Sequence, residues 1–249
     1  MKDKEIDEIL KQTAQAPHDV DPTLLDRVAN SIGSSLRPVR PLPPVWVLTG
    51  ALILICVAVA LGGAARAGFY GIQRMSDLER ALIFPALGIL VWLAASACVK
   101  EMIPGSRHRV ASGTLLGTGC LSLLVVFAAL FHDYRTVEFV SAGVVCLVVG
   151  LLIATPAALL SWLLLRRGFA VNPVAAGLAG GTLAGLAGVV MLELHCANFE
   201  ALHIMVWHTA VIPVSAAIGA LLAWRLGSRS VSGARGGAAT DQTVAPPRG

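Results

Sequence analysis

The chain has 249 residues, of which 56% are hydrophobic and only 14% are charged, and its formal net charge is +4 at pH 7. Soluble domains carry about 25% charged residues, so this composition excludes an ordinary soluble globular protein and indicates a membrane protein. The small basic excess is spread over short segments between apolar stretches, so we expect no direct contact with nucleic acid.

The first 44 residues are charged and amphipathic, unlike the rest of the chain. Residues 2–15 are typical of a short helix, and Asp21 followed by Pro22 predicts the start of a second one. Residues 37–44 are rich in proline and predict an extended spacer. In the second helix, apolar side chains recur at steps of three and four, as on one helical face: Leu24, Leu25, Val28, Ala29, Ile32 and Leu36.

The charge of this head indicates what its apolar face contacts. Residues 1–30 contain seven acidic and four basic residues, a net charge of −3. Helices that lie on a membrane surface are usually rich in Lys and Arg, because the inner leaflet is anionic. An apolar stripe in an acidic head, on a tether, fits better in a groove of a soluble, basic partner. We therefore predict partner binding through Leu24, Leu25, Val28 and Ile32, with association with membrane lipid as the alternative.

Six stretches are apolar over about the 20 residues that a membrane-spanning helix needs: 45–65, 81–99, 110–131, 139–165, 174–192 and 202–224. The predicted fold is all-α, a polytopic six-helix transmembrane bundle. The first stretch is too long for the core of a signal peptide, so we interpret it as a retained span. We expect three parts: a cytosolic head and linker over 1–44, the bundle over 45–226, and a disordered cytosolic tail over 227–249.

The basic residues predict the orientation of the bundle. With the N-terminus inside, fifteen Lys and Arg residues lie on the inner side, and only Arg66, Arg74, Arg80 and Arg135 lie outside. The positive-inside rule then places both termini in the cytoplasm, with the protein in the cell inner membrane. Within the bundle, Gly177, Gly181 and Gly185 are spaced four apart, which predicts close packing between helices.

Polar residues gather at the predicted outer ends of the last four spans. Such residues are costly at membrane depth and usually have a function. Cys146 and His132 lie at this same rim, and three histidines and a thiol fall within 14 residues: His195, Cys196, His203 and His208. Thiolate and imidazole suit soft or borderline metals such as zinc, copper(I) or cadmium. Two cysteines in an oxidising compartment can instead form a disulfide, if their Cα atoms come within about 7 Å.

The candidate residues receive different roles. Candidate signal-sensing residues are Cys146, His195, Cys196 and His208, and candidate metal ligands are Cys146, Cys196 and His195. On a continuous α-helix His203 and His208 point about 140° apart, so both cannot bind one ion unless the helix starts after His203. We interpret His203 and His132 as structural residues at helix ends. Three further cysteines lie inside spans and are interpreted as packing residues: Cys56, Cys98 and Cys120.

Other classes of function have less support. No nucleophile–base pair or phosphate-binding loop is evident, so we expect no enzyme activity. A small-solute or ion transporter is one alternative, although no charge lies near the middle of a span to bind a solute. A haem- or metal-binding membrane protein is another, with His208 and a partner such as His132 as ligands. We expect no cofactor other than a transient soft metal ion.

The acidic head, the proline-rich linker, the six spans, Leu194-His195-Cys196 and Trp207-His208 together resemble the membrane anti-sigma factors of the "negative regulator of sigma F" family. The resemblance implies that the N-terminal segment holds an extracytoplasmic-function sigma factor until a stress signal at the membrane releases it. It also implies that Cys146 is paired in role with Cys196. One departure is that the head contains no cysteine, whereas soluble anti-sigma domains often carry a His-x3-Cys-x2-Cys zinc motif.

Overall fold

The structure is a computed structural model that describes residues 11, 22–35, 43–103, 111–134, 138–166, 170 and 172–237. Throughout these residues the regular elements are helices, and no strand is formed. The chain divides into two units, Met1–Pro41 and Leu42–Gly249. The predicted helix at 2–15, apart from residue 11, lies outside the described residues, as do most of the predicted spacer at 37–44 and residues 238–249 of the predicted tail.

Residues 22–35 of the head form an amphipathic helix, α2 (Pro22–Ser35), which begins at the predicted residue. Proline is favoured in the first turn of a helix because its missing N–H would have no partner there. Leu24, Leu25 and Val28 are 49%, 55% and 47% exposed. The apolar face of α2 is therefore open within its own unit, and Ile32 follows one turn after Val28 on the same helix.

Among its described residues, the second unit contains six helices that are long and apolar enough to cross a membrane, which confirms the predicted fold class. Their bounds are α3 (Val45–Ala67), α5 (Asp77–Glu101), α6 (Ser112–Leu130), α7 (Phe139–Leu165), α8 (Pro173–His195) and a last span over Ala201–Leu226. The last span begins as α9 (Ala201–His203) and η1 (Ile204–His208) and continues as α10 (Thr209–Gly237). A short helix, α4 (Tyr70–Arg74), lies between α3 and α5.

Capping residues explain two helix starts. Helix α5 begins four residues before the predicted apolar stretch, because Ser76 and Glu79 form a capping box that satisfies backbone N–H groups at its start. At the start of α8, the side chain of Asn172 accepts a hydrogen bond from the N–H of Ala175, and Pro173 takes the first helical position. At the C-terminus α10 continues to Gly237, whereas the sequence predicted disorder from residue 227 onward.

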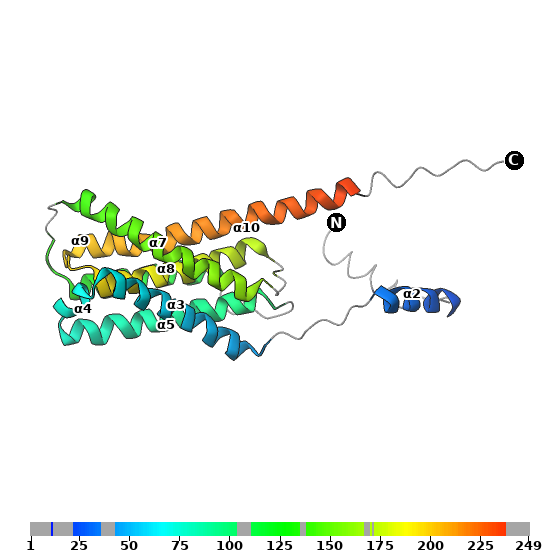
Figure 1. Ribbon diagram of the computed structural model, residues 1–249, viewed down its shortest axis with the longest axis horizontal. Coiled ribbons are helices and arrows are strands. Elements are labelled where there is room, and N and C mark those ends of the chain that lie inside the picture. The colour runs from blue at the N-terminus through cyan, green and yellow to red at the C-terminus, as the bar shows by residue number, and fades with distance from the viewer. Residues whose placement is uncertain are drawn as a thin grey trace. The chain divides into compact units, whose positions relative to one another are not determined.

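Helix α8 is the central helix of the bundle and packs against α3, α5, α6, α7 and α10 (Figure 1). In its most apolar window 67% of the residues are buried, against 11–39% for the other five spans. Glycine and alanine make this position possible, because small side chains allow neighbouring helix backbones to approach closely. The closest such contacts involve α10 and α7.

The predicted glycine ridge faces α10. A Cβ atom added to Gly177 would overlap the carbonyl oxygen of Gly219, and one added to Gly181 would overlap that of Ser215. On another side of α8, a Cβ on Gly188 would overlap the carbonyl oxygen of Gly150 in α7. Van der Waals contact between backbones therefore fixes the position of α8 against both helices.

Replacement of a ridge glycine tests this packing. We expect Gly181→Ala to lower the free energy of unfolding by about 1–3 kcal/mol, because the added methyl group overpacks the α8–α10 contact. Thermal unfolding of the purified protein in detergent measures the change. Gly180→Ala is the matched control, since a Cβ there meets no atom within 4 Å. Equal losses in the two variants would contradict the assigned contact.

Candidate functional site

The predicted outer ends of the helices meet around the turn between α8 and α9. Helix α8 ends at His195 because Cys196 has an extended backbone (φ −69°, ψ 122°), and the chain becomes helical again at Ala201. The N–H of Ala201 donates to the carbonyl oxygen of Asp133 over 2.6 Å, which fixes one end of the turn against the segment that follows α6. The turn therefore holds Cys196 in a defined place.

Helix α4 supports the same turn from another side. A Cβ atom on Gly71 would overlap the carbonyl oxygens of Glu193 and Cys196, so glycine is needed for this close approach. Arg74, also in α4, donates from its guanidinium to the carbonyl oxygen of Ala197 over 3.3 Å. These contacts constrain the backbone immediately before and after Cys196.

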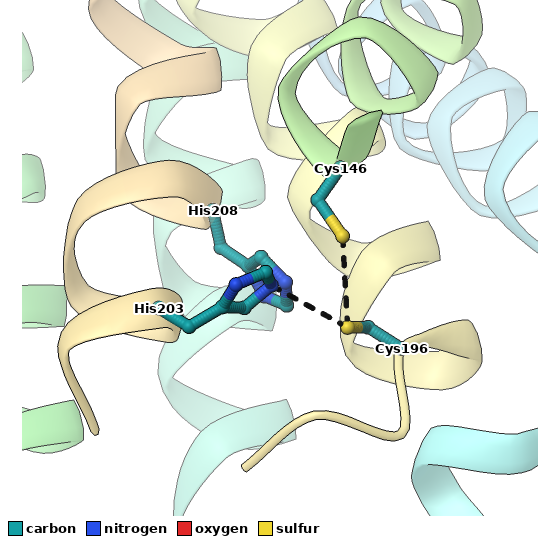
Figure 2. A group of neighbouring side chains, drawn as sticks. All are labelled: Cys146, Cys196, His203 and His208. Carbon is teal, nitrogen blue, oxygen red and sulfur yellow. Dashed lines mark hydrogen bonds between the residues drawn. The ribbon is translucent and has the colours of Figure 1, made fainter. Parts of the chain in front are cut away.

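The two candidate cysteines lie side by side. The Sγ atoms of Cys146, in α7, and Cys196 are 3.7 Å apart and are not bonded to each other (Figure 2). Both side chains are half-buried. The hydrogen bond with Cys146 and, after it, burial raise the pKa of the Cys196 thiol above its ordinary value, while contacts with His203 and His208 oppose the shift.

Two buried histidines complete the group. Nε2 of His203 lies 3.7 Å from Sγ of Cys196, and the rings of His203 and His208 meet edge to face with centroids 5.4 Å apart. Figure 2 shows both imidazoles pointing toward Cys196 from the last span. Their side chains are 0% and 1% exposed, respectively. The four donor atoms of Cys146, Cys196, His203 and His208 all lie within 4.8 Å of one another, and we call these residues the Cys–His cluster.

A π-helical turn brings the two histidines together. The segment η1 (Ile204–His208) has π-helical geometry, in which hydrogen bonds join residues five apart. Residues at that spacing then lie on the same side of the helix, which corrects the 140° separation expected for a continuous α-helix. Single π-turns inside α-helices are rare and occur frequently at functional sites.

A buried carboxylate orients one of the histidines. Nδ1 of His208 donates to Oε1 of Glu193 over 2.7 Å, and each side chain is only 1% exposed. With Nδ1 used in this way, Nε2 is the free nitrogen of His208. Among the described residues neither this nitrogen nor Oε2 of Glu193 has a hydrogen-bond partner. A buried polar atom without a hydrogen-bond partner costs free energy, so these two atoms indicate that a ligand or ion can bind here.

The family model for "negative regulator of sigma F" matches residues 33–227. The chain belongs to this family. The match covers all six spans and the Cys–His cluster, and it leaves most of the acidic head outside. The searches of curated proteins and of solved structures gave no match. Family membership makes the protein a negative regulator with a sigma factor as its partner, and such regulators are generally not enzymes.

His195 does not join the cluster in this family member. Nδ1 of His195 lies 3.0 Å from the carbonyl oxygen of Gly68, and its ring packs 5.9 Å from that of Tyr70. His195 thus connects the end of α8 to the segment after α3. His132 is exposed and also lies apart from the cluster.

The sequence predicts no role for Glu193 in the site and a structural role for His203. One signal for Glu193 is present in the sequence, because it is the single acidic residue in the long apolar stretch of 174–195. An acid at such a position usually has a partner or a function. The role of His203 depends on the π-turn, for which the residue pattern carries no comparable signal.

Proposed function

We propose that the protein is an inner-membrane anti-sigma factor that holds an extracytoplasmic-function sigma factor through α2 and releases it when a metal or oxidant acts on Cys146 and Cys196. The observation that carries the proposal is the open apolar face of α2 in a chain that belongs to a family of sigma-factor regulators. Both termini are cytoplasmic in this proposal, so that α2 reaches the soluble sigma factor.

The holding step rests on the side chains exposed on α2. Leu24, Leu25 and Val28 are each about half exposed, and their burial against a partner contributes roughly 2–4 kcal/mol in total. That amount alone gives only weak binding, so polar contacts and the charge of the head must add to it. The net charge of −3 in residues 1–30 favours encounter with a basic surface on the sigma factor.

The release step needs a signal that distinguishes two arrangements of the bundle. A ligand shifts such an equilibrium only by its difference in affinity for the two states. The Cys–His cluster joins α7 to the α8–α9 turn and to the last span, so a ligand bound there favours the arrangement in which these elements lie closest. Both α7 and α8 also pack against α3, the helix that follows the head and linker, and this contact is the proposed route to α2.

Co-purification from membranes tests the holding step. We expect the full-length protein to retain an extracytoplasmic-function sigma factor, and a variant that lacks residues 1–35 to lose it while still inserting in the membrane. A reporter that depends on the sigma factor is then silent with the full chain and active with the truncated one. Equal retention by both forms, or solute flux in proteoliposomes that survives the truncation, would favour the transporter alternative.

A further inference from the structure

We infer that Cys146, Cys196, His203 and His208 form a four-coordinate site for one Zn²⁺ ion or a cation of similar chemistry such as Cd²⁺. The inference deepens the proposed function, on which its signalling meaning rests, by naming the ligand and the complete donor set of the sensing site. The donor set differs from the one that the sequence predicted, since His195 is absent from it and two histidines of the last span are present.

The separations between donor atoms fit a tetrahedral ion. Zinc binds Cys sulfur at about 2.3 Å and His nitrogen at about 2.0–2.1 Å, which places tetrahedral ligands about 3.8 Å apart for two sulfurs and about 3.6 Å apart for sulfur and nitrogen. The sulfurs of Cys146 and Cys196 are 3.7 Å apart, and Cys196 Sγ is 3.7 Å from Nε2 of His203. With His208 included, no pair of donor atoms exceeds 4.8 Å, so small side-chain shifts complete the site.

The hydrogen bonds around the cluster point to a metal rather than to a disulfide. Metal-bound histidines almost always donate their other ring N–H to a carboxylate or carbonyl group, and His208 donates Nδ1–H to Glu193 in this way. Its Nε2 then faces the cluster, buried and without a hydrogen-bond partner in the part of the chain that the structure describes. A disulfide between the cysteines would leave this nitrogen unpaired, whereas a metal ion would bind it.

Ligand number and charge also favour this occupant. Two thiolates and two neutral imidazoles neutralise one divalent ion, and the carboxylate of Glu193, hydrogen-bonded to His208, is the remaining charge beside the site. Four protein ligands leave no open position for water, as in structural rather than catalytic zinc sites. Because the donors come from α7, the α8–α9 turn, α9 and η1, occupancy fixes the π-turn and the turn at Cys196 in one arrangement.

Metal titration of the full-length protein in detergent tests the site without any sigma factor. Protein that has been reduced and freed of metal by a chelator is titrated with Co²⁺, whose visible absorption reports tetrahedral geometry and thiolate ligation, and Zn²⁺ is then added as competitor. We expect one ion per chain, a tetrahedral thiolate spectrum, and displacement of Co²⁺ by Zn²⁺. An octahedral spectrum, or binding that needs no thiol, would overturn the inference.

Variants identify the donors. Cys146→Ser, Cys196→Ser, His203→Ala and His208→Ala are each expected to weaken Zn²⁺ binding by more than about 100-fold, beyond the 10–100-fold typical of residues that only orient a ligand. His195→Ala and Cys120→Ser are the matched controls and should stay within about threefold of the parent. Glu193→Gln should weaken binding by about 10–100-fold while the tetrahedral spectrum persists, which identifies Glu193 as a positioning residue. Loss of binding in His195→Ala together with retention in His203→Ala would overturn the donor set.

Two controls distinguish misfolding of a variant from failure of the metal site, and failure of the metal site from failure of the proposed anti-sigma role. The helical circular dichroism of each variant shows whether the bundle still folds, and the parent spectrum tests the site even if one variant does not. Capture of the sigma factor is measured separately on the same preparations. Capture without metal binding would refute the metal site alone, and metal binding without capture would refute the proposed anti-sigma role alone.

Discussion

Val28→Asp abolishes capture of the sigma factor by the full-length protein, and Leu25→Asp does the same. Each substitution puts a carboxylate in the apolar face of α2, where binding would bury it without a partner. The loss of the apolar contact and the cost of the buried charge together weaken binding by at least about 100-fold, equivalent to about 2.7 kcal/mol. Sigma-dependent transcription then becomes constitutive, which a reporter measures beside pull-down of the sigma factor from membranes.

Asn30→Asp is the matched control for Val28→Asp. It adds one negative charge to the same helix, two residues further along and therefore about 200° around its axis, on the face opposite the apolar stripe. We expect capture to stay within about threefold of the parent protein. Equal loss in Val28→Asp and Asn30→Asp would show that net charge rather than the apolar face controls binding, and capture by Val28→Asp would reject the docking face.

Cys146→Ser and Cys196→Ser each abolish release of the sigma factor by Cd²⁺ while they leave repression without the metal intact. The sulfurs of the two residues are in contact, so loss of either one removes a soft ligand from the cluster. A reporter that the parent protein induces about tenfold or more under Cd²⁺ should stay at its uninduced level in both variants. The reporter response disappears because each variant is expected to bind the metal more than about 100-fold more weakly. The metal then no longer shifts the equilibrium from the holding state to the released state.

Cys120→Ser is the control for the thiol variants, because Cys120 lies within α6 and outside the Cys–His cluster. It should respond to Cd²⁺ as the parent protein does. An unchanged response in Cys196→Ser would remove this thiol from the mechanism. Constitutive transcription in the serine variants would contradict the proposed direction, since it would mean that the occupied site holds the sigma factor rather than releases it.

The fold was largely predictable because hydropathy and small-residue spacing act over whole helices. Each of the six apolar stretches corresponds to one of the six spans among the described residues, and the glycines at 177, 181 and 185 pack closely against a neighbouring helix, as their spacing predicted. The structure identifies that neighbour as α10. The largest difference at a helix start is at α5, where the cap formed by Ser76 and Glu79 extends the helix beyond its apolar part. Caps depend on hydrogen bonds from a few polar side chains, which hydropathy alone does not detect.

The site was only partly predictable because its geometry depends on a few backbone details. The sequence singled out Cys196 with Cys146, and their sulfurs lie in contact. His195, adjacent to Cys196 in sequence, remains within α8 and contacts Gly68, since the helix ends between the two residues. A π-turn of five residues places His203 beside His208, and its occurrence depends on packing rather than on any residue pattern.

The central claim is that α2 holds the sigma factor at rest and that the Cys–His cluster controls this contact. Its most direct test is photo-crosslinking in intact cells, with photoreactive benzoylphenylalanine in place of Ser31 on α2. We predict a crosslink to the sigma factor in unstressed cells that disappears under Cd²⁺, and the same crosslink persisting under Cd²⁺ when Cys196→Ser is also present. No crosslink in unstressed cells would contradict binding through α2, and loss of the crosslink under Cd²⁺ in the Cys196→Ser background would contradict control by the Cys–His cluster.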